Sequence, residues 1–259
     1  MSDAPRVRVE VAAGVGRVAL ARPAKKNALD RRTADELHAA LASLEAAADV
    51  RAVLLTGDGD DFCAGADLEA LEGMLDAPAA AHRADAEALG QVFLLIRKMS
   101  KPVVAAVRGR ALAGGAGLAN ACDVVLAHED AQFGYPEVRV GFVPAMVMTM
   151  LRRSVGEKVA ADLVLTARHI DAAEAQRVGL VSRVLPGASF EAEVNAVLAG
   201  LAKTPREALG LTKSLFYRLD GLGFGEGIGE GIATNVEARA TEDFRAGVRR
   251  FVQRRERGG

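Results

Sequence analysis

The sequence has no tryptophan, two tyrosines and only two cysteines among its 259 residues. Cys63 and Cys122 are too few for a disulfide framework, and both lie among small apolar residues. We therefore expect reduced thiols in a cytoplasmic protein. The four histidines are scattered and form neither an HExxH motif nor a Cys/His cluster, so we expect no metal site.

The sequence also lacks long apolar runs and an excess of either charge. No window reaches the roughly 18 consecutive apolar residues of a membrane helix, and the opening MSDAPRVRVE is unlike a signal peptide. The formal charge of −1 argues against bulk binding to nucleic acid or to an anionic membrane. No G-x-S-x-G, G-x-G-x-x-G or Walker motif is present, so neither a serine hydrolase nor a nucleotide-binding loop is predicted.

What the sequence does have is a large apolar fraction, 50%, in patterns typical of alternating strands and helices. Residues 7–11 and 17–21 predict a hairpin, and the runs 53–55, 103–107 and 123–127 predict buried strands. Helical spacing of apolar residues appears between these runs. The pattern therefore predicts an α/β core.

The last third of the sequence changes character. From Ser189 onward the pattern is almost entirely helical. We therefore expect an α/β core over residues 1–190 and a C-terminal helical region over residues 191–259. The alternating glycines from Gly221 to Gly231 are interpreted as a loop between helices.

One stretch, residues 109–144, combines glycines with a carboxylate. Gly114, Gly115 and Gly117 stand beside small alanines, and the lack of a Cβ lets a backbone N–H approach a ligand. Such an N–H can donate to an oxygen that gains charge in a transition state. Glu137 follows Pro136 in the same stretch and is a candidate acid–base group. Tight packing of the glycines and a solvated helix start at Glu137 are the structural alternatives.

These residues resemble, in their order and spacing, the crotonase family, also called the enoyl-CoA hydratase/isomerase superfamily. The matching segments are Arg22–Leu29, Ala64–Leu68, Gly109–Asp123, Phe133–Glu137 and Thr241–Phe251. The resemblance implies a crotonase-like spiral of β-β-α units, with C-terminal helices that build a homotrimer or a dimer of trimers. It also implies an acyl-CoA substrate, an enolate intermediate, and no cofactor beyond the coenzyme A that the substrate carries.

The resemblance assigns roles residue by residue. The backbone N–H groups of Ala66 and Gly114 would form an oxyanion hole, and Glu137 would handle the substrate proton. Small residues suit the donors because the thioester oxygen must come within about 3 Å of each nitrogen. The expected coenzyme A contacts are Lys25, Lys26, Ala28, Ala64, Asp67 and Leu68. The expected lining of the acyl pocket is Leu112, Tyr135 and Met146, with core packing as the alternative.

The sequence departs from the two-glutamate hydratases of this family at Gly117, where those enzymes carry a second glutamate that helps to activate water. We therefore expect hydration of a 2-enoyl-CoA by Glu137 alone. Family isomerases also work with a single glutamate, so a Δ3-Δ2-enoyl-CoA isomerase is the alternative. Some family hydratases of branched, carboxylated enoyl-CoAs likewise have glycine at this position.

An alternative from another class is a non-catalytic relative that binds coenzyme A or RNA. The C-terminal arginines that could contact RNA are Arg249, Arg250, Arg254, Arg255 and Arg257. Few aromatic residues accompany them, so a solvated helix that faces an oligomer is the favoured interpretation, and no nucleic-acid partner is expected.

Overall fold

The computed structural model describes residues 4–258, with side chains in the last helix described as far as residue 253. A six-stranded sheet has the order β1-β2-β3-β4-β6-β9, with β1 antiparallel to β2 and the other neighbours parallel. Its strands are β1 (Val7–Ala12), β2 (Val15–Leu20), β3 (Ala52–Gly57), β4 (Val103–Val107), β6 (Val124–His128) and β9 (Arg183–Leu185). The predicted hairpin and buried strands are therefore confirmed.

A second, three-stranded sheet carries the segments that matter for the site. It consists of β5 (Arg110–Leu112), β7 (Gln132–Gly134) and β8 (His169–Asp171), with β5 parallel to β7. The smaller helices around it are η1 (Pro23–Lys25), α2 (Leu68–Glu72), α4 (Gly114–Ala121), η2 (Pro136–Val140), α5 (Ala145–Ser154), α6 (Glu157–Thr166) and α7 (Ala172–Arg177).

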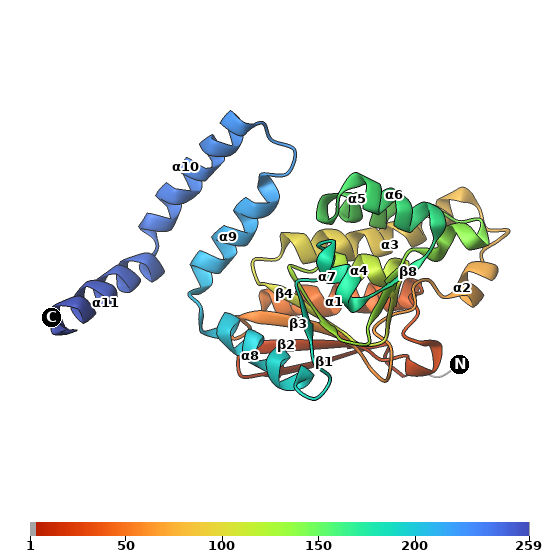
Figure 1. Cartoon of the computed structure of the whole chain (residues 1–259), viewed down its shortest axis with the longest axis horizontal. Helices are drawn as coiled ribbons and strands as arrows, with labels where there is room; N and C mark the ends of the chain where they lie inside the picture. The colour runs from red at the N-terminus through yellow and green to blue at the C-terminus, as the bar shows by residue number, and fades with distance from the viewer. Residues whose placement is uncertain (1–3, 259) are drawn as a thin grey trace.

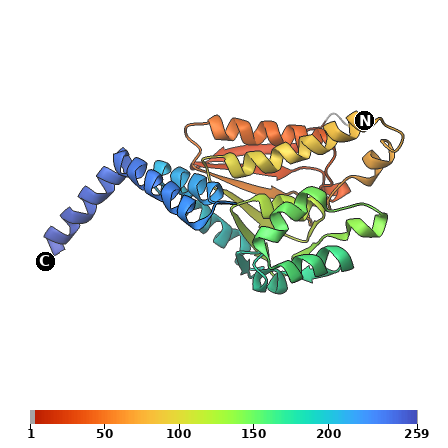
Figure 2. The ribbon, with the colours of Figure 1, turned by 90° about the horizontal axis from the view of Figure 1, so that it is seen from above.

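Helices α1 (Arg31–Ala46) and α3 (Ala79–Lys98) pack side by side on one face of the large sheet (Figures 1 and 2). α1 begins where Asp30 accepts a hydrogen bond from the N–H of Thr33 at 2.8 Å, which satisfies one of the free donors at a helix start. Its buried face is the apolar stripe that the sequence contains at helical spacing.

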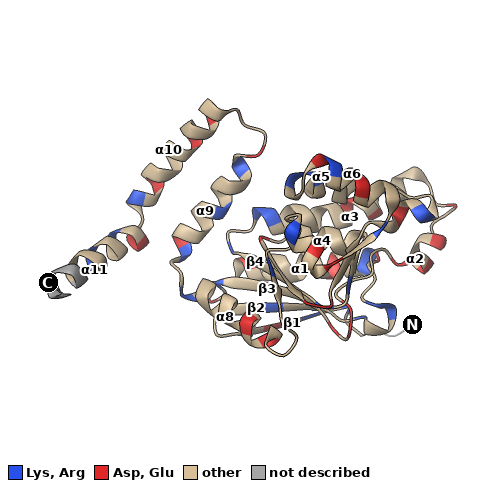
Figure 3. Cartoon of the chain, in the orientation of Figure 1, with Lys and Arg blue, Asp and Glu red and all other residues tan. Residues whose placement is uncertain are grey.

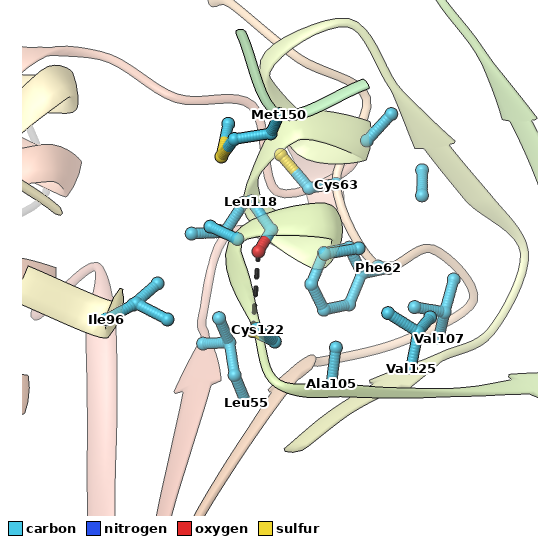
Figure 4. Packing of buried hydrophobic residues seen from close by; sticks show 14 of the residues in the cluster. Leu55, Phe62, Cys63, Ile96, Ala105, Val107, Leu118, Cys122, Val125 and Met150 are labelled. Atoms are coloured by element: carbon cyan, nitrogen blue, oxygen red, sulfur yellow. Dashed lines mark hydrogen bonds between the residues drawn. The ribbon is translucent and has the colours of Figure 1, made fainter. Parts of the chain in front are cut away.

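The central strands β2, β3 and β4 of the large sheet are largely buried on both faces, as strands in parallel pairs usually are. Leu55 and Ala105 point into the larger apolar cluster beneath α1 and α3, whereas Leu54 and Val104 point into a second cluster. Figure 4 shows the larger cluster, in which Cys122 donates to the carbonyl oxygen of Leu118.

The second cluster is closed by α8 (Phe190–Lys203), which supplies Phe190, Val194 and Leu198. The expected boundary at residue 190/191 therefore falls at the start of a helix that completes the core. Beyond it, α9 (Arg206–Arg218), α10 (Phe224–Ala240) and α11 (Glu242–Gly258) extend away from the sheet (Figure 1).

The interpretation of residues 221–231 as a loop is wrong beyond Gly223, because α10 begins at Phe224. The N–H of Gly223 donates to Oε2 of Glu226 at 3.0 Å, which caps the helix start. The helix also places four apolar side chains on one exposed face at a spacing of four residues: Phe224, Ile228, Ile232 and Val236. Such a face is typical of a helix that is stabilised by packing against another surface. This packing can override the poor helix propensity of glycine.

Candidate active site

The loop after β3 is held against the small sheet by backbone hydrogen bonds. The N–H of Cys63 donates to Arg110 at 2.9 Å, and the N–H of Leu112 donates to Cys63 at 3.0 Å. The side chain of Asp61 accepts from Nε of Arg110 at 2.8 Å and from Nη2 at 2.7 Å. Burial alone would raise the pKa of Asp61, but these hydrogen bonds outweigh it and hold the pKa below its ordinary value. The loop is therefore fixed at its start.

Ala66 lies in this loop beside Leu29, and its backbone N–H points away from Leu29. The N–H of Leu29 donates to Gly65 at 2.7 Å, and the N–H of Asp67 donates to Leu29 at 2.8 Å. These two bonds flank Ala66 in a parallel bridge, so the polar groups of Ala66 itself point to the other side. Within residues 4–258 no group accepts from the Ala66 N–H. That donor is thus free for a ligand.

Gly114 presents a second free donor beside the first. It is the first residue of α4, where an N–H has no partner inside the helix. The preceding Ala113 has φ +50° and ψ −122°, a conformation that costs on the order of 1–3 kcal/mol in a residue with a side chain. Its N–H is fixed to the carbonyl of Gly134 at 2.8 Å. The strained turn at Ala113 therefore fixes the orientation of the first residue of α4 and of its N–H group.

Gly65 brings the two donor segments together. Its φ of +97° and its surroundings both require glycine, because a Cβ there would lie 2.8 Å from Cβ of Ala113 and 2.9 Å from the carbonyl oxygen of Leu112. Gly115 has the same role from the other side, since its Cβ would lie 2.3 Å from the carbonyl oxygen of Cys63. The loop and the start of α4 are in direct contact as a result.

Glu137 faces the same space from η2. Its side chain is half-buried, and its Oε2 is fully buried without a hydrogen-bond partner among the described residues. Burial raises the pKa of Glu137 above its ordinary value. The turn is closed by the N–H of Phe142, which donates to the Glu137 carbonyl at 3.0 Å. A buried, unpaired carboxylate oxygen is suited to accept a proton from a bound molecule.

These groups line a cavity of about 210 Å³. Ala66, Gly114 and Glu137 all contribute to its wall, and so do Asp67 and Met146 from the predicted binding residues. Several further residues of the wall were not predicted from the sequence. All of them are apolar except Asp85: Leu29, Leu71, Met74, Asp85, Leu89, Phe142, Val143 and Val147. Of these residues, only Asp85 could have been singled out from the sequence. It is a charged residue four positions before Leu89, so it lies on the same face of the helix as the start of the apolar stripe.

The predicted coenzyme A contacts other than Asp67 lie outside this cavity wall. The side chain of Lys25 pairs with Glu69, and Ala64 donates to the carbonyl of Lys26 at 3.0 Å. Ala28 is buried and Leu68 is exposed. These segments adjoin Asp67, which caps α2 and forms an ion pair of 2.7 Å with Arg22. Burial alone would raise the pKa of Asp67, but the hydrogen bond from Arg22 helps to hold it below its ordinary value.

Two of the residues predicted for the acyl pocket lie outside this cavity wall. Tyr135 is completely buried behind Glu137 and does not line the cavity, and its Oη has no partner among the described residues. Burial, and to a smaller extent the charge of Glu137, raises the pKa of Tyr135. Leu112 is also absent from the wall. Met146, the third, does line the cavity.

The structure gives a steric reason for the missing second glutamate. Gly117 is buried in α4, and a Cβ there would lie 2.2 Å from Cγ1 of Val147 and 3.4 Å from the ring of Phe93. Side chains from α5 and α3 thus occupy the space that a larger residue would need. Four carboxylates line the described cavity: Asp30 and Asp67 pair with Arg22, whereas Oε2 of Glu137 is fully buried without a partner among the described residues, and Asp85 is the fourth.

Other chemistries find no support in the described part of the chain. Among residues 4–258 no group of three or more potential metal ligands comes together. Cys63 and Cys122 are free and buried, and burial raises the pKa of Cys63 to about 12, so neither thiol is a nucleophile at neutral pH. No helix in the same range is long and apolar enough to cross a membrane.

The fold and the cavity define an enzyme of the acyl-thioester class, and comparison with known proteins agrees. The model of the family described as enoyl-CoA hydratase/isomerase matches residues 10–257. The chain belongs to this family, and it is an enzyme of the enoyl-CoA hydratase/isomerase type.

Individual relatives match over nearly the full chain. A Thermus thermophilus protein named "Putative enoyl-CoA hydratase" is 43% identical over 90% of this chain and 92% of its own length. A crotonyl-CoA hydratase from Syntrophomonas wolfei is 35% identical over 91% of this chain and 90% of its own. Among solved structures, AtuE of Pseudomonas aeruginosa has a TM-score of 0.91 at 33% identity, covering 96% of this chain and 97% of its own.

Proposed function

We propose that this chain adds water across the double bond of a 2-enoyl-CoA thioester, with Glu137 as its single acid–base group. The observation that carries the proposal is that Glu137, whose buried Oε2 has no partner among the described residues, lines the same cavity as Ala66 and Gly114, whose N–H groups are free. Coenzyme A enters and leaves as part of the substrate, so the reaction needs no other cofactor.

In the first half of the reaction, the thioester oxygen accepts hydrogen bonds from the Ala66 and Gly114 N–H groups. Glu137 takes a proton from water as the water oxygen forms a bond to C3. The electron pair of the C2–C3 double bond moves toward the thioester, and the two donors hold the enolate oxygen. The free start of α4 adds its positive dipole end to this stabilisation.

In the second half, protonated Glu137 delivers the same proton to C2, and the thioester carbonyl reforms. One carboxylate therefore serves both steps, first as base and then as acid. Its raised pKa suits this role, because proton transfer is most efficient when the pKa of the group approaches the working pH. The space beside Gly117 is filled by Val147, so no second carboxylate can enter from that position.

The alternative is a Δ3-Δ2-enoyl-CoA isomerase, which the single carboxylate also favours. Glu137 would then remove a proton from C2 of a 3-enoyl-CoA and return it to C4. The two reactions have opposite effects on the conjugated thioester, which absorbs ultraviolet light. Hydration removes the conjugation and its absorbance, whereas isomerisation of a 3-enoyl-CoA creates them. We expect absorbance to fall when the protein is mixed with a short trans-2-enoyl-CoA. No change with that substrate, together with a rise from a 3-enoyl-CoA, would favour the isomerase.

A non-catalytic role in RNA binding receives less support from the charges. Basic and acidic residues are interspersed along the helices in the view of Figure 3. Arg249 and Arg250 lie on α11, whereas the side chains of Arg254, Arg255 and Arg257 lie outside the described residues. We therefore propose no nucleic-acid partner, and we place the protein in the cytoplasm because its two buried cysteines are free thiols.

We also propose that α9–α11 join copies of this chain into a homotrimer or a dimer of trimers. The support is the exposed apolar face of α10, where Phe224 is 90% exposed and Val236 is 65% exposed. Such side chains favour burial against another surface. Light scattering should then give a mass of three or six times 27.1 kDa, and a monomer would contradict the proposal.

A further inference from the structure

Asp85 is a carboxylate in the wall of the active-site cavity to which the proposed reaction gives no role. It lies on α3 one helical turn before Leu89, and both residues line the cavity. Leu89 is the residue of α3 nearest the oxyanion donor, because a Cβ on Gly114 would lie 3.6 Å from its Cδ2. One turn of helix spans about 5.4 Å, so Asp85 stands about that far along the wall from Leu89.

The Asp85 carboxylate is half-buried and unpaired. No described residue donates a hydrogen bond to it or forms an ion pair with it. Two charges, those of Arg31 and, to a smaller extent, His82, favour the ionised form of Asp85. Arg31 is bound to another carboxylate, since its Nε donates to both oxygens of Asp35 at 2.9 and 3.0 Å. Its Nη1 donates to the carbonyl of Ala84 at 3.0 Å.

The surrounding charges leave Asp85 uncompensated. Asp30, which also lines the cavity, is held by Arg6 and by Thr33. Burial raises the pKa of Asp85, and the charge of Arg31 opposes this only in part. An unpaired carboxylate in a largely apolar wall is costly unless a ligand supplies a donor. The wall at this point is thus suited to a polar group on the acyl chain and unsuited to an anionic one.

We propose that Asp85 is a specificity-determining residue, which accepts a hydrogen bond from a hydroxyl group on the acyl chain and disfavours carboxylated acyl chains. The inference rests on the proposed function in that it takes an acyl-CoA as the ligand of the cavity. The position of Asp85 supports a role in recognition and not in the chemistry. C2 and C3 lie next to the thioester oxygen at Gly114, whereas Asp85 is a further helical turn beyond Leu89.

The test measures binding of saturated acyl-CoAs by calorimetry, so it needs no turnover. The probes are hexanoyl-CoA, 6-hydroxyhexanoyl-CoA and adipyl-CoA, which share a chain length and differ at the end. A hydrogen bond to a charged acceptor contributes about 1.5–3 kcal/mol, equivalent to about a tenfold change or more in affinity. The preference of the wild type for the hydroxylated over the plain chain should therefore fall about tenfold in Asp85→Leu. Adipyl-CoA should bind more tightly to that variant than to the wild type.

The matched control is Glu87→Gln, which removes a charge from the same helix outside the cavity wall. It should leave all three affinity ratios unchanged. If Asp85→Leu binds the three thioesters in the same ratios as the wild type, the inference is wrong although the proposed function stands. If Asp85→Asn lowers turnover of crotonyl-CoA as much as Glu137→Gln does, Asp85 is a catalytic group and the inference is also overturned. If no acyl-CoA binds to the wild type, the proposed function itself fails.

Discussion

Two helices of this protein are rich in glycine for different physical reasons. In α4, added Cβ atoms at Gly115 and Gly117 would lie 2.3 Å and 2.2 Å from neighbouring atoms. In α10, a Cβ added at Gly225, Gly229 or Gly231 would meet nothing within 4 Å. The first helix uses glycine to permit close approach of another segment, whereas the second has open space around the same residue type.

This difference distinguishes the glycines of α4, which position the active site, from those of α10, which do not. Close packing of α4 against the loop at Cys63 sets Gly114 beside Ala66, and this juxtaposition creates the pair of free donors. Gly225, Gly229 and Gly231 each make α10 less stable by about 1 kcal/mol relative to alanine, and no described contact inside the chain requires glycine at these three positions. Changes in α4 should therefore affect catalysis, and changes in α10 should affect stability alone.

The largest effect should follow removal of the Gly114 N–H alone. Replacing the residue with glycolic acid changes this amide to an ester and leaves the packing of α4 intact. We expect kcat to fall about 10²–10³-fold, because the enolate oxygen loses one of its two donors. Stopped-flow absorbance of the conjugated thioester measures the change in kcat. The same exchange at Gly229 in α10 should leave kcat unchanged, and equal losses at both positions would remove the distinction between the helices.

A smaller effect is expected for Gly115→Ala. The new methyl group must displace the carbonyl of Cys63, and overpacking of this kind costs about 1–3 kcal/mol in the free energy of unfolding. Because that carbonyl also accepts from Leu112, the shift should disturb the loop that carries Ala66 and lower kcat as well. Urea denaturation and the hydration assay check the two effects. Unchanged stability would show that the contact of α4 with the loop is loose.

The smallest effect, with opposite sign, is expected for Gly229→Ala. Alanine should raise the free energy of unfolding by about 1 kcal/mol because it improves helix propensity where no atom opposes its Cβ. Thermal unfolding of the assembled protein measures the change, and catalysis should not respond. A fall in stability would mean that α10 needs glycine for close contact with another copy, so that the two helices would be alike.

The sequence predicted much of the site because backbone donors leave a local pattern. Ala66, Gly114 and Glu137 stand in short motifs whose order could be matched to a family, and the structure brings all three to one cavity. The sheet was equally predictable, since strands buried on both faces, such as β4, appear as unbroken apolar runs.

The remaining features depend on contacts that no local pattern records. The sequence does not show whether Tyr135 faces the cavity or the core, and the structure buries this side chain completely, outside the cavity wall. The filling of the space at Gly117 depends on Val147, thirty residues away in α5. Residues 224–231, the first half of α10, were interpreted as a loop because their glycine content outweighed the apolar spacing that stabilises the helix. In each of these cases tertiary packing overrides local preference.

The most direct test of the central claim, that one carboxylate performs both proton transfers, is the pH profile of kcat/KM for the wild type and Glu137→Gln. The wild-type value should rise with pH through a pKa above that of an ordinary glutamate, because burial raises the pKa of Glu137 and only its ionised form accepts the proton of water. In Glu137→Gln this acidic limb should disappear, with kcat lowered about 10²–10⁴-fold and binding of hexanoyl-CoA unchanged. A Glu137→Gln enzyme that keeps full activity and the same pH profile would contradict the account.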